Sequence, residues 1–240
     1  MSLHDIQELV RDKDVLLVGN NLSGVEKDQG HLIDCYDIVV RFGKGVTTGR
    51  TRQLGAKTDL WVTGEFRKKM RGFFPDAEVL WNPSSYKTVP EPPEYEHTEM
   101  FGREEIEKIN KEYGSQGSRR LSAGAITAYW FVHAVATQRS LSLINFDFFH
   151  HSILFKDNKQ DMTNKASSWH IPIALAPYQN LDPATHPAHD LMIERKLFET
   201  LLEREDVCFC GTMPKAPKII ECDGAAYDDV REQIELYTEE

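Results

Sequence analysis

Several histidines gather in one irregular stretch of the chain, where they could transfer protons. His170, His186 and His189 lie there, and Glu194 follows His189 after four intervening residues. The ordinary pKa of an imidazole lies near neutral pH, so each of these side chains could act as a general acid or base. A zinc site is the alternative, but Pro187 interrupts the helical spacing that would align two of the histidines, and no further ligand motif stands nearby. The pattern favours proton transfer, although each histidine taken singly could also be a surface residue that leads into a helix.

A second group of candidate residues ends the first apolar run, VLLVGNNLSG at 15–24. Gly19, Asn20 and Asn21 come directly after the buried-type residues, and a glycine lets a ligand approach the backbone closely. The spacing matches neither the G-x-G-x-x-G fingerprint nor a P-loop. We interpret the segment as a candidate nucleotide site, with a plain strand-to-loop turn as the alternative.

The third candidate is the start of a helix predicted in LSAGAITAYWFVHAVA. Ser122 stands where an N-cap belongs, and the small residues Ala123 and Gly124 open a helix whose free N–H groups could hold an anion. The strand predicted behind this helix ends in INFDFFHH, where Asp147 could accept a hydrogen bond from a sugar hydroxyl and Phe149 could wall a base. An ordinary capped core helix is the alternative.

The elements that must position these residues alternate between strand and helix. Apolar runs bounded by turn residues predict strands at 15–19, 37–42, 59–63, 78–81, 140–147 and 207–211. Helical periodicity predicts helices at 103–113, 124–137, 189–204 and 224–237, after a short amphipathic helix at the N-terminus. Because most strands are continuous apolar runs, they are typical of parallel strands covered on both faces. We expect one α/β domain over residues 1–240, with a doubly wound, mostly parallel, Rossmann-like sheet, ligands at the carboxyl ends of its strands, and irregular segments at 82–98 and 150–188.

Charge and cysteine content exclude some classes of function. The net charge of −10 argues against a general nucleic-acid binder, although a basic island at 41–57 suits a small anionic ligand, an anionic acceptor or a plain solvated face. No run approaches the ~20 apolar residues of a membrane span, and no secretory signal opens the chain. The four cysteines form no CxxC pair, and we expect Cys208 and Cys210 on opposite faces of their strand. These features favour a reducing, cytoplasmic compartment.

Taken in order, the candidate segments resemble the sialyltransferases. The long motif of the animal-type family is similar to VGNNLSG, IDCYDIVVRFGKG and LGAKTD in this chain, and the short motif is similar to SAGAITAYWFVHA followed by SLSLINFDFF. The closing motif, a histidine and a glutamate five positions apart, is similar to His189 and Glu194. The smaller bacterial sialyltransferases show the same order of motifs, and the resemblance spans about residues 14–211.

The resemblance implies an inverting, metal-independent transfer of sialic acid, or a related sugar, from a CMP-sugar donor to a hydroxyl of a glycan acceptor. His189 would be the general base, His186 would replace it if the loop aligns three residues earlier, and His170 would face the departing phosphate. The Asp-x-Asp triplet that holds a metal in many sugar-nucleotide transferases occurs only at Asp12–Asp14, ahead of the first strand. The implied nucleotide-binding residues are Gly19, Asn20, Asn21, Arg41, Thr63, Ser122, Ala123, Gly124, Asp147 and Phe149.

Two positions depart from the family pattern. Gly43 stands where the family has asparagine, and Ala123 stands where it has threonine. These departures leave two alternatives open: a nucleotide-binding protein of the same fold without turnover, or a transferase that uses another nucleotide sugar.

Overall fold

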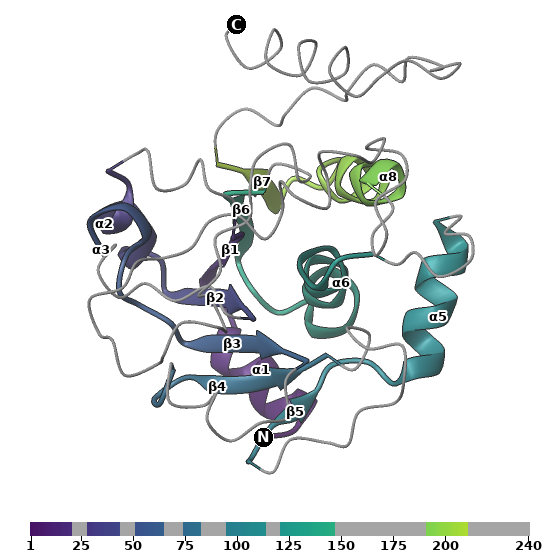
Figure 1. The fold of residues 1–240 in the computed structure, drawn as a ribbon, viewed down its shortest axis with the longest axis horizontal. Helices are drawn as coiled ribbons and strands as arrows, with labels where there is room; N and C mark the ends of the chain where they lie inside the picture. The colour runs from purple at the N-terminus through teal and green to yellow at the C-terminus, as the bar shows by residue number, and fades with distance from the viewer. Residues whose placement is uncertain are drawn as a thin grey trace, which may run out of the picture.

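The structure is a computed structural model that describes residues 1–20, 28–43, 51–64, 74–82, 95–113, 121–146 and 191–210. In these ranges the chain forms a seven-stranded sheet in the order β5-β4-β3-β2-β1-β6-β7 (Figure 1). The strands are β1 (Asp14–Val18), β2 (Ile38–Phe42), β3 (Leu60–Thr63), β4 (Glu78–Trp81), β5 (Thr98–Glu99), β6 (Ser140–Ile144) and β7 (Val207–Phe209). Each neighbouring pair is parallel, so all the carboxyl ends lie along one edge of the sheet.

Helices cover both faces of the sheet, as expected for a doubly wound fold. The helices are α1 (Leu3–Val10), α2 (Gly30–Asp34), α3 (Thr51–Leu54), α5 (Arg103–Glu112), α6 (Ala123–Trp130) and α8 (Leu191–Leu201), and a π-helical turn, η3 (Phe131–Val135), continues α6. Buried side chains of α1, α5, α6 and α8 join the larger core on one face, and Ile33 of α2 packs on the other. Both faces of the central strands are therefore apolar, which explains the continuous runs in the sequence.

The central strand shows why the chain folds in this way. Val15, Leu16 and Leu17 are fully buried; Val15 and Leu17 join the larger core, and Leu16 joins the cluster beneath α2. At about 25 cal/mol per Å² of apolar surface, burial on both faces favours this run at the centre of the sheet rather than at an edge. At the N-terminus, Ser2 and Asp5 form a reciprocal capping box that starts α1.

The predicted fold class is confirmed: the described strands form a parallel sheet with helices on both faces. The structure ends β6 at Ile144, three residues before the predicted end, and adds α2, α3 and β5, which the sequence patterns did not reveal. The expected helix at 224–237 and the irregular segment at 150–188 lie outside the described residues.

The expectation for Cys208 of β7 and Cys210, the residue directly after β7, was wrong. Residues two positions apart in a strand share a face. Cys208 Sγ lies 3.0 Å from Ser142 Oγ, and Cys210 Sγ lies 3.4 Å from the hydroxyl of Tyr36 on the same side of the sheet. Burial is the main cause that raises the pKa of the Cys210 thiol.

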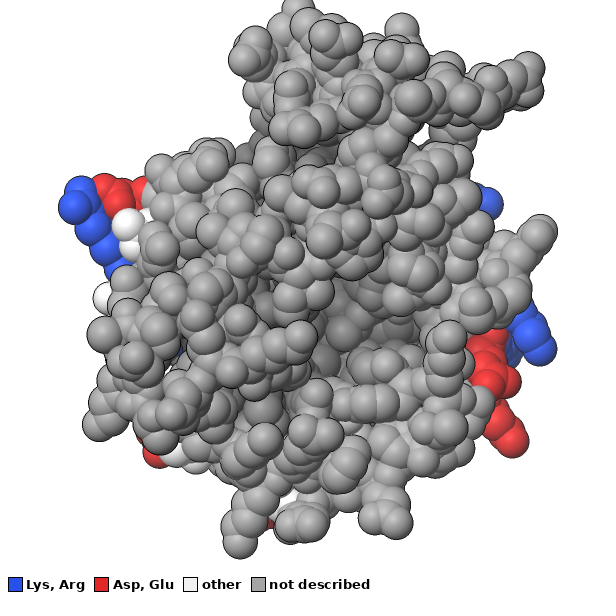
Figure 2. All heavy atoms as spheres, viewed as in Figure 1, with Lys and Arg blue, Asp and Glu red and all other residues white. Residues whose placement is uncertain are grey.

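Charged side chains are mixed in sign where they come into view. In the face shown in Figure 2, acidic and basic side chains lie side by side at the flank near α2 and α3 and at the flank near α5. Arg52 pairs with Asp28 at the first flank, and α5 carries both signs along its length. In the ranges that the structure describes, no helix has the length and apolar character needed to cross a membrane.

Candidate functional site

The strand order marks one point on the carboxyl edge of the sheet. From β1 the chain builds outward through β2 to β5, and it then crosses to the opposite side of β1 to form β6 and β7. In open parallel sheets, ligands bind outside the carboxyl ends of the strands at such a topological switch point. Here the switch point lies between β1 and β6, where Gly19 and Asn20 follow one strand and Asn145 and Phe146 follow the other.

Gly19 is packed directly against the neighbouring strand end. Its N–H donates to the carbonyl of Ile144 over 2.8 Å, and a Cβ placed on it would lie 2.1 Å from the carbonyl oxygen of Asn145. A larger residue would have to displace backbone rather than a flexible side chain. The close approach of β6 therefore accounts for this glycine without a ligand, and a contact of Gly19 with nucleotide stays a prediction.

Asn20 joins the end of β1 to the end of β2. Its Nδ2 donates to the carbonyl of Phe42 over 2.9 Å, which fixes the orientation of the amide at the carboxyl edge. The side chain is partly exposed. This placement makes Asn20 a residue that a ligand at the switch point could reach.

The N-terminus of α6 is capped by residues from two helices. Ser122 Oγ accepts from the N–H of Ala125 over 3.2 Å, as an N-cap does. In a capping box, the N–H of the cap residue is bound by a side chain of the same helix. Here Glu194 of α8 takes that place: its carboxylate accepts from Ser122 N–H at 2.9 Å and from Ser122 Oγ at 2.8 Å.

This carboxylate changes the interpretation of the helix start. Glu194 is only 2% exposed, and its negative charge lies at the positive end of the α6 dipole. The first turn of α6 thus already holds an anion that belongs to the chain, where the sequence pattern suggested room for an external one. The same contact ties α8 to α6 across 72 positions of sequence.

Phe146 connects the elements that surround the switch point. Its ring packs so closely on Gly124 that a Cβ there would lie 2.4 Å from the ring. It also meets Phe42 and Phe198, with ring centroids 5.9 and 5.5 Å apart. Gly124 is therefore required by an aromatic neighbour, and Phe146, which is partly exposed, is an aromatic side chain at this edge that the sequence interpretation passed over in favour of Phe149.

Arg41 and Thr63 are buried rather than displayed. The Arg41 guanidinium donates to the carbonyls of Leu54 and Lys57 and to Thr58 Oγ1, at 2.6 to 3.0 Å, and the residue is 2% exposed. Burial lowers the pKa of Arg41 to about 10, so it remains a cation at neutral pH. These contacts assign Arg41 a structural role beneath the loop that follows α3. Thr63, at the end of β3, is also 2% exposed.

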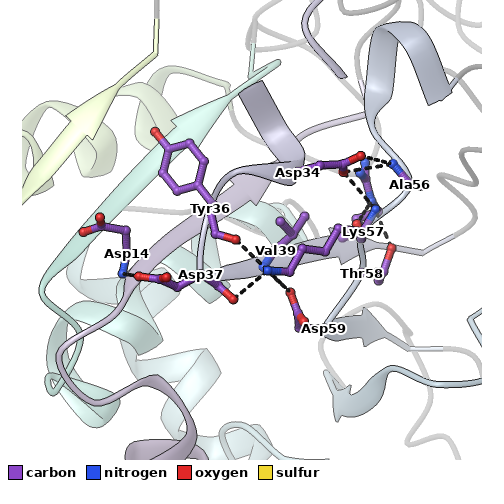
Figure 3. A network of polar contacts seen from close by, with 10 residues as sticks. Asp14, Asp34, Tyr36, Asp37, Val39, Ala56, Lys57, Thr58 and Asp59 are labelled. Atoms are coloured by element: carbon purple, nitrogen blue, oxygen red, sulfur yellow. Dashed lines mark hydrogen bonds and ion pairs between the residues drawn. The ribbon is translucent and has the colours of Figure 1, made fainter. Parts of the chain in front are cut away.

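A polar network joins the turns at the opposite, amino-terminal edge of the sheet (Figure 3). Asp34 accepts from the backbone N–H groups of Ala56 and Lys57 at 2.9 Å, and Lys57 Nζ donates to the carbonyls of Tyr36 and Asp37 at 2.6 and 2.8 Å. Two further carboxylates bind backbone N–H groups at strand starts: Asp37 accepts from Asp14, and Asp59 accepts from Val39. The GAKTD part of the long motif thus serves the connections between strands.

The described cations of the basic island all have partners within the chain. Arg41 is buried, Arg52 pairs with Asp28, and Lys57 belongs to the network at the amino-terminal edge. Arg41 and Lys57 thus bind groups of the chain's own backbone, whereas Arg52 lies in an exposed ion pair. Lys44 and Arg50 lie outside the described residues.

Gly43, one of the two departures from the family pattern, has a conformational reason. Its φ is +52°, in the left-handed region that favours glycine, and a Cβ there would meet nothing within 4 Å. Its carbonyl accepts from Trp61 Nε1 over 2.8 Å. The turn after β2 selects this glycine.

The remaining predicted site residues lie outside the described ranges. They are His170, His186, His189, Asn21, Asp147 and Phe149. Among the residues that are described, no three His, Cys, Asp or Glu side chains are grouped so that they could hold a metal ion.

Comparison with known proteins identifies the architecture. No protein-family model matches the sequence, and no curated protein does either. A crystal structure of a mammalian sialyltransferase in complex with Gal-beta-1-3GalNAc-ortho-nitrophenol superposes with a TM-score of 0.54 at 18% identity, over 86% of this chain and 72% of that one. Another mammalian sialyltransferase structure gives 0.53 at 18% identity, over 88% and 79%.

The chain has the sialyltransferase fold. This agrees with the Rossmann-like sheet expected from the sequence, and at 18% identity the likeness concerns the fold alone. Within this sialyltransferase fold, Asn145 and Phe146 are described residues at the switch point that the sequence patterns did not place in the site, whereas Glu194 was named there only as the partner of His189 in the closing motif. An asparagine directly after an apolar run is a turn signal, and it could have located the end of β6.

Proposed function

We propose that the protein is a glycosyltransferase that moves sialic acid, or a related sugar, from a CMP-linked donor to a hydroxyl of a glycan acceptor. The fold shared with mammalian sialyltransferases supports this reaction class. One of those structures was determined with Gal-beta-1-3GalNAc-ortho-nitrophenol, which makes a galactose-containing glycan a suitable first acceptor to test.

The observation that carries the proposal is the bond between Glu194 and Ser122. The helix α8 begins at Leu191. His189 stands two positions before Leu191, and Glu194 stands three positions after Leu191. Glu194 is bound to the cap of α6, whose first turn packs on Phe146 at the switch point. His189, the proposed proton acceptor, is therefore close in sequence to Glu194, whose contact with Ser122 is fixed beside the expected nucleotide site.

In the proposed reaction His189 acts as the general base. It takes the proton of an acceptor hydroxyl while that oxygen attacks the anomeric carbon of the donor sugar, and the bond to the CMP phosphate breaks with inversion at that carbon. The phosphate gains charge as it leaves, so hydrogen-bond donors must face it, and His170 is the proposed side chain for this role. No step requires a metal ion.

The nucleotide would occupy the carboxyl edge beside β1 and β6. Asn20 is a described residue proposed to approach it, and the segment Ser122–Gly124 would do so through groups other than the Ser122 N–H and hydroxyl, which Glu194 binds. Asn21, Asp147 and Phe149 complete the proposal from residues outside the described ranges. A transferase that takes another nucleotide sugar would bind it at the same edge. Binding experiments therefore have to identify the nucleobase of the donor.

Parallel calorimetric titrations with CMP, UDP and GDP test the donor class directly. We expect CMP to bind most tightly. Tighter binding of UDP or GDP would indicate that the donor is a UDP-linked or GDP-linked sugar instead. Absence of binding by all three would refute it.

The proposed base is tested with His189→Ala, using CMP-sialic acid and a galactose-containing acceptor. Loss of a general base typically lowers turnover by about 10²–10⁴-fold, and CMP affinity should stay within about twofold of wild type. His4→Ala is the matched control, because His4 is an exposed residue of α1. Wild-type turnover by His189→Ala would exclude His189, and His186→Ala then tests the alternative base. CMP binding without transfer or donor hydrolysis by the wild type would instead support the nucleotide-binding protein without turnover.

A further inference from the structure

Asn145 combines a strained backbone with an unsatisfied side chain at the switch point. It follows β6 directly, and its φ of +60° lies in the left-handed region, which residues other than glycine seldom adopt. Its Nδ2 is buried, and within the described structure it has no hydrogen-bond acceptor. Strained backbone conformations cluster at functional sites, and a buried polar group without a partner calls for a water, an ion or a ligand that satisfies it.

The orientation of this amide is held from one side. Asn145 Oδ1 accepts from Gln29 Nε2 over 2.9 Å, and Gln29 is the residue before the first turn of α2. The backbone of Asn145 is held as well, because its carbonyl group lies against Gly19. In this orientation the oxygen is bound to Gln29 and the main chain is packed against Gly19, and Nδ2 is left without an acceptor.

A buried N–H without an acceptor destabilises the folded protein unless a water, an ion or a ligand accepts from it. Asparagine tolerates the left-handed conformation better than most residues other than glycine, so the turn accounts for its backbone but not for its buried donor. The unexplained part of the residue is its donor.

We infer that Asn145 is a nucleotide-binding residue whose Nδ2 donates a hydrogen bond to an oxygen of the bound nucleotide. This inference rests on the proposed function, which places a nucleotide at the same edge. It assigns Asn145 a role beyond the turn that it forms, on the side of β1 opposite to the contact of Asn20 with Phe42.

The test compares Asn145→Gly with Asp12→Gly. Both wild-type residues have a positive φ, +60° and +57°, so glycine relieves similar backbone strain at each position. Asp12 lies in the turn between α1 and β1, at the amino-terminal edge of the sheet. Urea unfolding first establishes that both variants are folded, and calorimetry then measures their affinities for CMP and for cytidine.

We expect Asn145→Gly to weaken CMP binding about tenfold and Asp12→Gly to leave it within about twofold of wild type. Asn145→Asp keeps an acceptor for Gln29 but replaces the donor with an anionic oxygen, so it should weaken CMP binding further than glycine does. A loss confined to CMP assigns the contact to the phosphate, and an equal loss for cytidine assigns it to the nucleoside.

Two results would overturn the inference, and they differ in what they say of the proposed function. If wild type binds CMP and both Asn145 variants bind it equally well, Asn145 only forms the turn, and the proposed function stands. If wild type binds none of CMP, UDP and GDP, the proposed function fails, and this inference fails with it.

Discussion

The amino-terminal and carboxyl-terminal edges of the sheet use polar side chains in opposite ways. At the amino-terminal edge, the charged groups of Asp34, Lys57 and Asp59 form hydrogen bonds with nearby backbone groups. These bonds hold the connections between strands in place. At the carboxyl-terminal edge, Asn145 keeps a buried donor without a described acceptor, on a backbone with positive φ. The charged groups of the amino-terminal network are satisfied by the chain itself, whereas the buried Nδ2 of Asn145 is the group for which we infer a ligand.

Glu194 belongs to the carboxyl-terminal edge but is satisfied from within the chain. Its carboxylate completes the cap of α6 and so fixes the position of α8, the helix that follows His189 in sequence. We therefore regard it as the structural support of the site rather than a group that binds the ligand.

The largest effect is expected for Glu194→Ala. Two hydrogen bonds to a buried carboxylate disappear and the N–H of Ser122 loses its acceptor, so the free energy of unfolding should fall by about 3–5 kcal/mol. Glu194→Gln keeps one acceptor oxygen and should lose less. Glu199→Ala is the control on the same helix, because Glu199 is half exposed and pairs with Arg195 at the surface.

Urea unfolding followed by circular dichroism measures these losses. Nucleotide affinity should weaken in Glu194→Gln at temperatures where the variant is folded, since the cap of α6 shifts. A loss for Glu194→Ala no larger than that for Glu199→Ala would contradict the supporting role of Glu194.

An intermediate effect is expected from alanine at Gly19 and at Gly55, one glycine for each edge. A Cβ on Gly19 would lie 2.1 Å from the carbonyl oxygen of Asn145, and a Cβ on Gly55 would lie 2.3 Å from a carboxylate oxygen of Asp34. Gly55 also has a φ of +71°. Each substitution should lower the free energy of unfolding by about 2–3 kcal/mol.

The two variants should differ in nucleotide binding. Gly19→Ala displaces Asn145 and should weaken CMP affinity, whereas Gly55→Ala should leave the affinity of the folded protein unchanged. Calorimetry at a temperature where both are folded checks this. Equal affinities for CMP in the two variants would contradict a functional difference between the two edges of the sheet.

The smallest effect is expected for Asp14→Asn at the amino-terminal edge. Hydrogen bonds from Arg139 and Ser140 lower the pKa of Asp14 below its usual value of 3.8, and its side chain is 37% exposed. The ion pair should stabilise the protein by about 0.5 kcal/mol at neutral pH, with no effect on CMP affinity. Because the folded pKa is the lower one, this stabilisation is present above pH 3.8 and is lost as the pH falls through the folded value.

Urea denaturation of wild type and Asp14→Asn at pH 7 and pH 3 measures the difference. The two proteins should differ at pH 7 and converge at low pH. A difference that grows on acidification would reverse the sign of the predicted linkage.

The strands of the core were predictable from the sequence because burial on both faces leaves a continuous apolar run. The elements that escaped prediction are short: β5 is the pair Thr98–Glu99, α2 is the five residues Gly30–Asp34, and α3 is the four residues Thr51–Leu54. Such segments owe their conformation to the tertiary contacts around them rather than to periodicity.

The site was only partly predictable, for a related reason. The sequence marked Gly19 and Gly124 as candidate nucleotide contacts, but it did not reveal the groups that lie against them, a carbonyl and an aromatic ring from other segments. The pairing of Ser122 with Glu194 spans 72 positions, and neither residue reveals its partner by type or spacing. In the sequence, Arg41 has the type and position expected of a residue that binds phosphate. The structure shows that its guanidinium donates to backbone carbonyls instead.

Titration of CMP into isotope-labelled protein, followed by the amide chemical shifts, tests the contrast between the two edges most directly. The account predicts that the largest shifts fall on Gly19, Asn20, Gly124 and Asn145, and that the amides of Asp34, Ala56 and Lys57 do not move. Shifts centred on the amino-terminal network, or no shifts on addition of CMP, would contradict it.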